Sequence, residues 1–438
     1  MQTGQGRGSA RGSRRAIQRQ AIYAGLDLGT TKAACLIAQV DGVNPDGSPL
    51  LRVIGSGLTA SRGVRAGAII DLDAAEDAVR SAVAQAEGQA GLTLQSIILA
   101  LNCANPESHC GGAEVPVAGR EIDERDVRNA VAAARAKCSV RGADIMFSAP
   151  VSYAVDHTHD ILDPRGMIGS RLGARVLVVS AMRGPIENLE LCVQRCHLDV
   201  QDRVLSGLAS GIATTVPDER KLGTVVVDIG GGTTSLTVFA QGQMIHTDRI
   251  ALGGNHITTD VARGLSTTVS QAERLKTLYG SVIPGAHDER DTIVVTRVGE
   301  NDAYSHIKAP RKSLTSIIRP RAEEILEIVR DRLVNCGYDK ISGRGLVITG
   351  GSAPLNGLRE LASQIFGRQA RLGRPLRMSG LTEANNGGAF AACAGLVLRA
   401  ALEANRTGAP EVLPLEEPVA PWPVKKLFGV SRWIKERF

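Results

Sequence analysis

The stretch that decides the fold is Val225–Thr234, which reads Val-Val-Val-Asp-Ile-Gly-Gly-Gly-Thr-Thr. An earlier stretch, Tyr23–Thr31, repeats this order of apolar strand, acid, glycine and paired threonines as Tyr-Ala-Gly-Leu-Asp-Leu-Gly-Thr-Thr. A second apolar run follows each turn, so both stretches predict a strand–turn–strand unit. Asp27 and Asp228 are 201 residues apart, close to half of the chain length. We therefore predict two similar α/β halves that face each other across a ligand cleft.

Length and composition place the chain among soluble α/β proteins. Its 438 residues suit about two or three domains, and 43% of the residues are apolar. No apolar run approaches the ~20 residues that a membrane span needs. The first twenty residues contain five arginines but no apolar core, so we expect no secretory signal. The eight cysteines are scattered without a Cys-x-x-Cys pair, which favours a reducing compartment over a disulfide framework or a zinc ribbon.

Positive charge is concentrated at the two ends of the chain. Residues 1–20 carry +5 and residues 424–438 carry +4 in side chains, against a total of +6. The body between them is therefore slightly acidic, and we expect no nucleic-acid partner. We interpret residues 1–20 as a disordered arginine-rich arm, and residues 403–423, which contain five prolines, as an extended linker.

The two glycine turns have the chemistry of a phosphate site. Such turns direct successive backbone N–H groups and hydroxyls into one space, where oxyanions fit. An aspartate so close to phosphates would repel them unless Mg²⁺ lay between, held through water. We therefore assign Asp27 and Asp228 to the metal. The phosphates are assigned to Gly29, Thr30, Thr31, Lys32, Gly230, Gly231, Gly232, Thr233 and Thr234.

One copy of this pattern would be weak evidence, because ordinary turns also favour Asp, Gly and Thr. Two copies half a chain apart favour the phosphate interpretation. Neither a Gly-x-x-x-x-Gly-Lys-Ser/Thr motif nor a strand-linked Gly-x-Gly-x-x-Gly motif competes with it.

A third segment completes a resemblance to the actin/Hsp70/sugar-kinase superfamily. Residues 345–358 read Gly-Leu-Val-Ile-Thr-Gly-Gly-Ser-Ala-Pro-Leu-Asn-Gly-Leu and resemble its adenosine motif. The resemblance implies an actin-like fold, with two ribonuclease-H-like domains around a cleft for ATP and Mg²⁺. It implies that Gly350 and Gly351 let the backbone approach the adenine and ribose. It also implies that Glu273 and Lys276 grip the nucleoside, with a surface ion pair between them as the alternative.

Within that superfamily, the chain resembles the FtsA family of bacterial cell-division proteins over about residues 20–400 and at the extreme C-terminus. Segments 163–176, 246–260 and 319–324 carry this resemblance. It implies a peripheral protein on the cytoplasmic face of the inner membrane at the division site. There it would polymerise into filaments, tether filaments of the tubulin-like protein FtsZ and help recruit later division proteins. The FtsZ C-terminal peptide is expected on Arg319, Arg321 and Glu324.

The same resemblance implies a division into subdomains, including an FtsA-type subdomain called 1C. We expect subdomain 1A at 21–92, 1C at 93–180, the rest of 1A at 181–222, 2A at 223–280, 2B at 281–340, and the C-terminal part of 2A and 1A at 341–402. Strands and loops are predicted over 281–318, followed by a helix from Pro320 to Asn335.

A departure from the superfamily pattern bears on catalysis. Relatives that hydrolyse ATP carry Glu or Gln in the segment connecting the domains, where it orients the attacking water. The matching segment here, Arg203–Ala213, contains neither residue. We therefore predict firm nucleotide binding with at most slow hydrolysis, and we assign no catalytic residue.

The last fifteen residues, 424–438, have the pattern of a membrane-surface helix. Most apolar side chains fall in one helical stripe, with Trp433 off it, and the segment is too short and too charged to span a bilayer. We expect it to bind anionic lipids through Lys425, Leu427, Phe428, Trp433, Ile434 and Phe438. Docking of this helix on the protein's own core is the alternative. One such helix binds weakly, so filament formation would strengthen membrane binding through avidity.

Two rival functions belong to the same superfamily: a small-molecule phosphotransferase and a rod- or pilus-type actin homologue. A phosphotransferase would need a catalytic carboxylate near the γ-phosphate and a sealed substrate pocket, and it would have no use for a basic amphipathic tail. The rod- or pilus-type homologue would differ in its partner.

Overall fold

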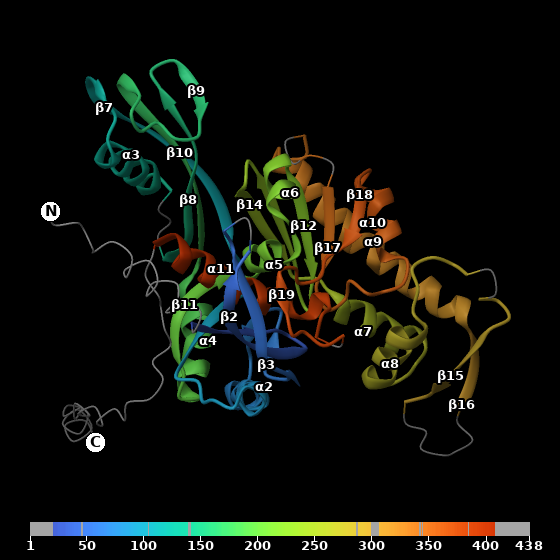
Figure 1. Ribbon diagram of the computed structural model, residues 1–438. Coiled ribbons are helices and arrows are strands. Elements are labelled where there is room, and N and C mark those ends of the chain that lie inside the picture. Colours follow the sequence, from blue (N-terminus) through green and yellow to red (C-terminus); the bar gives the residue numbers. More distant parts are fainter. Residues whose placement is uncertain are drawn as a thin grey trace, which may run out of the picture.

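The computed structural model describes residues 21–407 apart from 45–46, 104, 139–141, 286–287, 299–305, 341–342, 344 and 384. Two halves, each built on a β-sheet, lie side by side, and a smaller module projects from the first half (Figure 1). None of the described helices is long and apolar enough to cross a membrane.

The sheet of the first half consists of β1 (Ile22–Leu28), β2 (Lys32–Val43), β3 (Pro49–Ala60), β6 (Ser96–Leu101), β11 (Asp199–Leu205) and β19 (Met378–Ser379). Its order is β11-β6-β1-β2-β3-β19, with β1, β2 and β3 antiparallel and β6 and β11 parallel to β1.

Alternation along β1 supplies both faces of this sheet. Tyr23 joins the core beneath the C-terminal helix α11 (Ala391–Thr407). Leu26 points to the other face and packs with α2 (Leu72–Ala90) and α4 (Arg183–Arg195). The first half is therefore covered by helices from both ends of the chain.

The sheet of the second half consists of β12 (Thr224–Ile229), β13 (Thr234–Ala240), β14 (Gln243–Ile250), β17 (Gly345–Thr349) and β18 (Gln369–Leu372). Its helices are α7 (Gly254–Gly264), α8 (Val269–Tyr279), α9 (Arg311–Asn335) and α10 (Leu358–Phe366), and a hairpin of β15 (Thr292–Thr296) and β16 (His306–Pro310) lies beside them. The short elements of the chain are β4 (Val64–Arg65), β5 (Ala68–Ile69), α6 (Pro217–Leu222) and the 3-10 helix η1 (Gly388–Phe390).

Five strands of the first sheet match the five strands of the second, and β19 is an addition at the edge of the first. The order β3-β2-β1-β6-β11 in the first half corresponds to β14-β13-β12-β17-β18 in the second. In both, an antiparallel meander of three strands is extended by two parallel strands. The prediction of two similar halves, made from the repeated turns, is therefore confirmed.

Two helices cross where the halves join. α5 (Ser206–Thr214) leads from the first sheet toward the second, and α11 packs across it. A Cβ atom added to Gly395 of α11 would lie 1.8 Å from the carbonyl oxygen of Ala209. Only glycine allows such an approach, so this position fixes how closely the two helices pack.

The projecting module is an insertion between β6 and α4. It consists of β7 (Glu107–Glu121), α3 (Glu124–Ala136), β8 (Ala143–Val155), β9 (Thr158–Ile161) and β10 (Ile168–Met182), with the sheet order β7-β10-β8-β9. Because β6 pairs with β1, residues 96–101 belong to the first sheet, whereas the sequence analysis placed them in subdomain 1C.

The long helix α9 begins at Arg311, nine residues before the predicted start at Pro320, so that prediction was wrong. Backbone N–H groups of Arg311 and Lys312 donate to the carbonyls of Asp291 and Asp288, which satisfies the first turn. Burial of Leu314 within the core of the second half then holds this turn in place. Tertiary packing thus overrides the usual preference of proline for a helix start. Segment 319–324 lies inside α9 instead of opening it.

Candidate functional site

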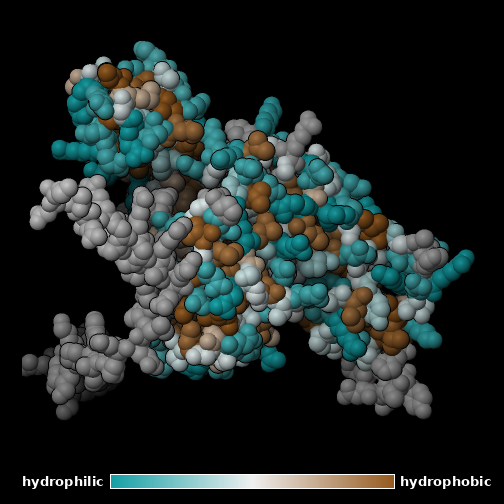
Figure 2. Space-filling model, in the orientation of Figure 1, coloured by the Kyte–Doolittle hydropathy of each residue, from teal (hydrophilic) through white to brown (hydrophobic). Residues whose placement is uncertain are grey.

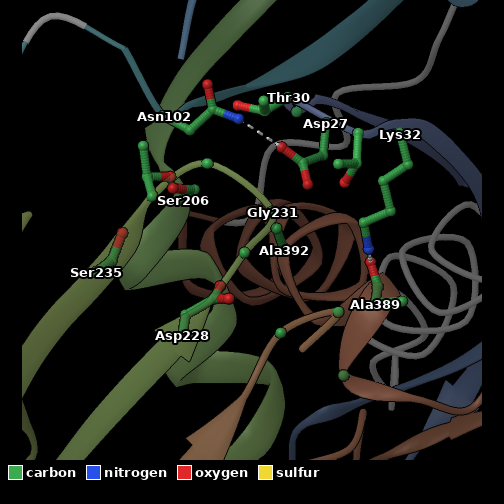
Figure 3. Close-up of a pocket in the computed structure, with 18 residues that line it drawn as sticks. Asp27, Thr30, Lys32, Asn102, Ser206, Asp228, Gly231, Ser235, Ala389 and Ala392 are labelled. Atoms are coloured by element: carbon green, nitrogen blue, oxygen red, sulfur yellow. Dashed lines mark hydrogen bonds between the residues drawn. The ribbon is translucent and has the colours of Figure 1, made fainter. Parts of the chain in front are cut away.

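The two glycine turns meet at one cleft between the halves (Figure 3). Each turn is closed in the same way: Gly29 N–H donates to Lys32 O at 2.8 Å, and Gly230 N–H donates to Thr233 O at 2.9 Å. Most of the predicted residues line this cleft, namely Asp27, Gly29, Thr30, Thr31, Lys32, Asp228, Gly230, Gly231, Gly232, Thr233, Gly350 and Gly351.

Glycine is required where the turns face each other. A Cβ atom on Gly231 would lie 2.6 Å from Oγ1 of Thr31, and one on Gly232 would lie 2.4 Å from Oγ1 of Thr30. Both distances are shorter than any real contact of this kind, so side chains on this loop would push the halves apart.

Three predicted nucleotide residues do not line the cleft. Thr234 is buried, and its hydroxyl donates to Leu252 O at 2.8 Å, while the next residue, Ser235, lines the cleft instead. Glu273 and Lys276 form an ion pair on α8, with 2.7 Å between Oε2 and Nζ. The ion pair weighed as the alternative for these two residues is therefore present, but Lys276 is largely buried and also donates to Thr258 Oγ1 at 2.8 Å. Their contact with a nucleoside stays a prediction.

The pKa values of the two aspartates are both raised. Burial raises the pKa of Asp27, against the opposing charge of Lys32 and a hydrogen bond from Asn102. Burial also raises the pKa of Asp228 to about 6, and the negative charge of Asp27 adds to that rise while a hydrogen bond from Ser210 opposes it. These two carboxylates repel each other, and a cation between them would lower that repulsion.

This donor set fits Mg²⁺. Magnesium prefers oxygen ligands and is usually held by one or two carboxylates together with waters and substrate phosphates. Within residues 21–407, outside the gaps given above, no cluster of three or more His, Cys, Asp or Glu side chains could form a metal site from protein ligands alone. Asp27 and Asp228 would therefore hold the ion jointly with a bound phosphate.

Lys32 lies in the same cleft but is directed across it. Its ammonium group donates a hydrogen bond to the carbonyl oxygen of Ala389, in the 3-10 helix η1 (Figure 3). Burial lowers the pKa of Lys32, and the negative charge of Asp27 opposes that effect. The Lys32 side chain thus links the first glycine turn to η1, which comes after the adenosine-motif segment 345–358 in the chain.

Gly350 is required by the protein itself. Its φ is +95°, in the left-handed region, and an added Cβ atom would lie 2.4 Å from Oδ1 of Asp228. Gly351 differs, because an added Cβ atom there would meet only Nζ of Lys32, at 3.9 Å. The absence of a side chain at Gly350 therefore leaves room for the Asp228 carboxylate. At Gly351 the absence of a side chain leaves open space that a ligand could fill.

Sequence reasoning missed several residues of the cleft. Asn102 and Ser206 line it, each directly after a strand of the first sheet, and Ser210 of α5 donates a hydrogen bond to Asp228. The position of Asn102 at the carboxyl end of β6, beside β1, was the available signal, because ligands collect at such ends. For Ser210 the serine- and glycine-rich α5 segment carried no comparable signal.

The predicted partner residues lie on one stretch of α9. Arg321 Nε donates to Oδ2 of Asp260 at 2.6 Å, and its guanidinium also pairs with Glu324. Arg319 pairs with Glu323 at 2.7 Å. Hydrogen bonding to Asp260 raises the pKa of Arg321. The structure therefore brings Arg321 and Glu324 into direct contact.

The predicted membrane residues Lys425, Leu427, Phe428, Trp433, Ile434 and Phe438 lie outside the described residues, as do the arginine-rich arm at 1–20 and linker residues 408–423.

Comparison with known proteins identifies the family. Two proteins described as cell division protein FtsA, from Rhizobium meliloti (strain 1021) and Escherichia coli (strain K12), are 39% and 32% identical to this chain. The alignments cover 96% and 95% of this chain and 96% and 98% of those proteins. The chain belongs to the FtsA family. The profile of cell division protein FtsA matches residues 225–395, and that of the SHS2 domain inserted in FtsA matches residues 104–180, which coincides with the projecting module.

Solved structures show the fold. A protein of the PilM–PilN type IV pilus biogenesis complex superposes with a TM-score of 0.61 at 18% identity, over 86% of this chain and 98% of that chain. MreB5 of Spiroplasma citri, solved bound to ADP, superposes with a TM-score of 0.51 at 14% identity, over 89% and 99%. The predicted actin-like fold with an FtsA-type insertion is thereby confirmed. Because the family is one of cell-division proteins, FtsA membership also decides against the phosphotransferase and the pilus- or rod-type homologue.

Proposed function

We propose that this actin-like cell-division protein binds ATP with Mg²⁺, polymerises on the cytoplasmic face of the inner membrane at the division site, and tethers FtsZ filaments there. The observation that carries the nucleotide part is the pair of identically closed turns on opposite sides of one cleft, one preceded by the buried Asp27 and the other by the half-buried Asp228. The nucleotide in the structural relative MreB5 supports it, since that protein was solved bound to ADP.

Each part of the cleft has a task in nucleotide binding. Backbone N–H groups of the two turns would bind phosphate oxygens, and Lys32 would exchange the Ala389 carbonyl for a phosphate. Mg²⁺, when bound, would neutralise phosphate charge between Asp27 and Asp228. The first turn of α5 contributes Ser206 to the cleft and no Glu or Gln, which supports slow hydrolysis.

The nucleotide proposal is tested by equilibrium binding of a fluorescent ATP analogue to the full chain. We expect saturable binding that weakens when EDTA removes Mg²⁺, and hydrolysis far below about 10 turnovers per second. Turnover at that typical enzyme rate would contradict the absence of a water-orienting residue.

We further propose that the FtsZ C-terminal peptide binds α9 at Arg319, Arg321 and Glu324. Arg321 is partly exposed and already shared between two carboxylates, so an acidic peptide group could replace one of them without leaving a buried charge unpaired. In a pulldown with the peptide, Arg321→Glu should abolish capture. Arg330→Glu, on the same helix and paired only with its neighbour Asp331 among the contacts described, is the matched control and should retain it. Equal capture by both variants would refute this surface.

The membrane part of the proposal concerns residues 424–438. Deleting them should abolish flotation of the protein with vesicles that contain anionic lipids, and should leave nucleotide binding unchanged. A deleted protein that still floats would show that membrane binding lies elsewhere. If the full-length chain does not float with these vesicles either, the proposed tethering to the membrane is refuted.

Self-association is proposed to involve the inserted module, where later division proteins are also proposed to dock. Leu162, directly after β9, and Ile168, the first residue of β10, are 66% and 75% exposed, and apolar surface is visible among the polar side chains of this module (Figure 2). Exposed apolar groups of this kind commonly mark contact surfaces. We also propose that bound nucleotide holds the two halves in the relative orientation in which subunits stack into filaments. Equal polymerisation with and without ATP would count against this dependence of filament formation on nucleotide.

A further inference from the structure

Asn102, which was not among the predicted site residues, lies where the cleft meets the contact between the two halves. It follows β6 directly, and its side chain lines the cleft beside Asp27 (Figure 3). Its backbone carbonyl, in contrast, faces the second half of the molecule. One residue thus touches the nucleotide cleft with its side chain and the opposite half with its main chain.

The side-chain amide of Asn102 holds Asp27. Its Nδ2 donates to Oδ1 of Asp27 at 3.2 Å and to Leu28 O at 3.0 Å. Both partners are acceptors only, so the nitrogen must face them and the orientation of the amide is fixed. This pair of bonds occupies one carboxylate oxygen and restrains the rotation of the Asp27 side chain.

The fixed orientation leaves Oδ1 of Asn102 without a donor. This oxygen is buried and has no hydrogen-bond partner among the described residues. A buried acceptor without a partner costs about 1–3 kcal/mol. The amide keeps its orientation despite this cost, because turning it over would remove both hydrogen bonds of Nδ2. Asn102 therefore acts on the site through Nδ2 and the Asp27 carboxylate.

Arg249 of β14 fixes the main chain at the same residue from the other half. Its Nη1 donates to the carbonyl oxygens of Asn102 and, at 3.2 Å, of Ala66, and its Nη2 donates to Oδ1 of Asn105 at 2.7 Å. Gly67 permits this arrangement, because a Cβ atom there would lie 2.1 Å from Asn102 O and 2.5 Å from Nη1 of Arg249. These bonds join β14 of the second half to loops of the first half.

We propose that Asn102 is a positioning residue of the metal–nucleotide site and that Arg249 sets it in place when the halves close. The inference rests on the proposed binding of nucleotide with Mg²⁺ and adds to it. Asn102 orients the Asp27 carboxylate through the hydrogen bond from its Nδ2. Arg249 reaches neither the metal nor the nucleotide, yet it makes this arrangement depend on the relative position of the two halves.

The test measures the dissociation constant of a fluorescent ATP analogue for the full chain, once with Mg²⁺ titrated in and once in EDTA. Groups that orient metal ligands typically contribute 10–100-fold to metal affinity. We therefore expect Asn102→Ala to weaken the apparent Mg²⁺ affinity by about 10–100-fold, with less than about 2-fold change in EDTA. Asn102→Leu, which keeps the volume without polar atoms, should show the same loss. A residue that only fills space would retain wild-type Mg²⁺ dependence in the leucine variant, and that result would overturn the proposal.

Arg249→Lys tests the second part, because lysine keeps the charge but cannot reach three acceptors with a planar fork. It should reproduce the loss of Mg²⁺ affinity. Arg332→Lys is the matched control, since Arg332 pairs with Asp248, the neighbour of Arg249, at the surface, and it should behave as wild type.

The outcomes separate the two proposals. If the wild-type chain binds nucleotide with no Mg²⁺ dependence, or does not bind it, the proposed function fails and the inference fails with it. If the wild-type chain shows Mg²⁺-dependent binding and the Asn102 variants match it, only the inference fails. Loss in the Asn102 variants without loss in Arg249→Lys would overturn the role of Arg249.

Discussion

The raised pKa of Asp228 makes a prediction about stability in the absence of ligand. Its pKa is about 6 in the folded protein against an ordinary value of 3.8. A carboxyl whose folded pKa is raised contributes full stability below pH 3.8, and that contribution is lost as the pH rises through 6. Asp228→Asn removes the ionisation and keeps an oxygen for the hydrogen bond from Ser210. We therefore expect the variant to be more stable than wild type at neutral pH.

The magnitude follows from the size of the shift. A rise of about two pKa units corresponds to about 3 kcal/mol once the group is fully ionised, near pH 7.5. At pH 4, where most of the carboxyl is protonated in the folded state, the difference falls to about 0.5 kcal/mol. For a domain of 150–250 residues, about 3 kcal/mol corresponds to a gain in melting temperature of about 6–12 °C.

Thermal unfolding in EDTA, followed by circular dichroism between pH 4 and pH 7.5, measures this effect. Asp199→Asn is the control, because Asp199 is exposed on β11 and away from the cleft. Adding Mg²⁺ with ATP should then stabilise wild type and not Asp228→Asn, which reverses the order. A variant that is less stable than wild type at pH 7.5, or a difference that does not grow with pH, would refute the electrostatic reasoning.

Two further predictions concern glycine and cysteine positions. Gly350→Ala should lower the melting temperature by several degrees and abolish nucleotide binding, because its Cβ atom would collide with Asp228, whereas Gly351→Ala should fold normally; equal stability of the two variants would contradict this. Cys110 is the exposed thiol, and burial raises the pKa of Cys35 to about 12, so a thiol-specific chromogenic reagent should react first at Cys110. The fast phase should disappear in Cys110→Ser, and its persistence would show that another cysteine is accessible.

The repeated turns were sufficient to predict the duplicated fold. A strand, an acid and a glycine turn are encoded within about ten consecutive residues, so local sequence carries the whole signal. The same locality explains why Asp27 and Asp228 were found together with the turns. Their partners Asn102 and Ser210 come from other strands and helices, and only the folded sheet brings them near.

The predictions failed in two situations. In one, the sequence did not show which of two adjacent residues faces the cleft, and in the other a tertiary contact changed where a helix begins. Thr233 and Thr234 look equivalent in sequence, but β13 begins at Thr234 and alternation directs this side chain inward and Ser235 toward the cleft. Pro320 carries a local helix-start signal that the packing of the preceding turn overrides. Such effects depend on residues far along the chain, which a local pattern does not contain.

The way in which α11 closes the first half has a consequence for synthesis of the protein on the ribosome. One face of β1, near the start of the chain, is covered by residues 391–407, and a Cβ atom on Gly25 would lie 3.0 Å from Cys393 O. This face of the sheet therefore stays exposed to solvent until almost the whole polypeptide has left the ribosome. Nascent or truncated chains would expose an apolar sheet surface, which chaperones and proteases recognise.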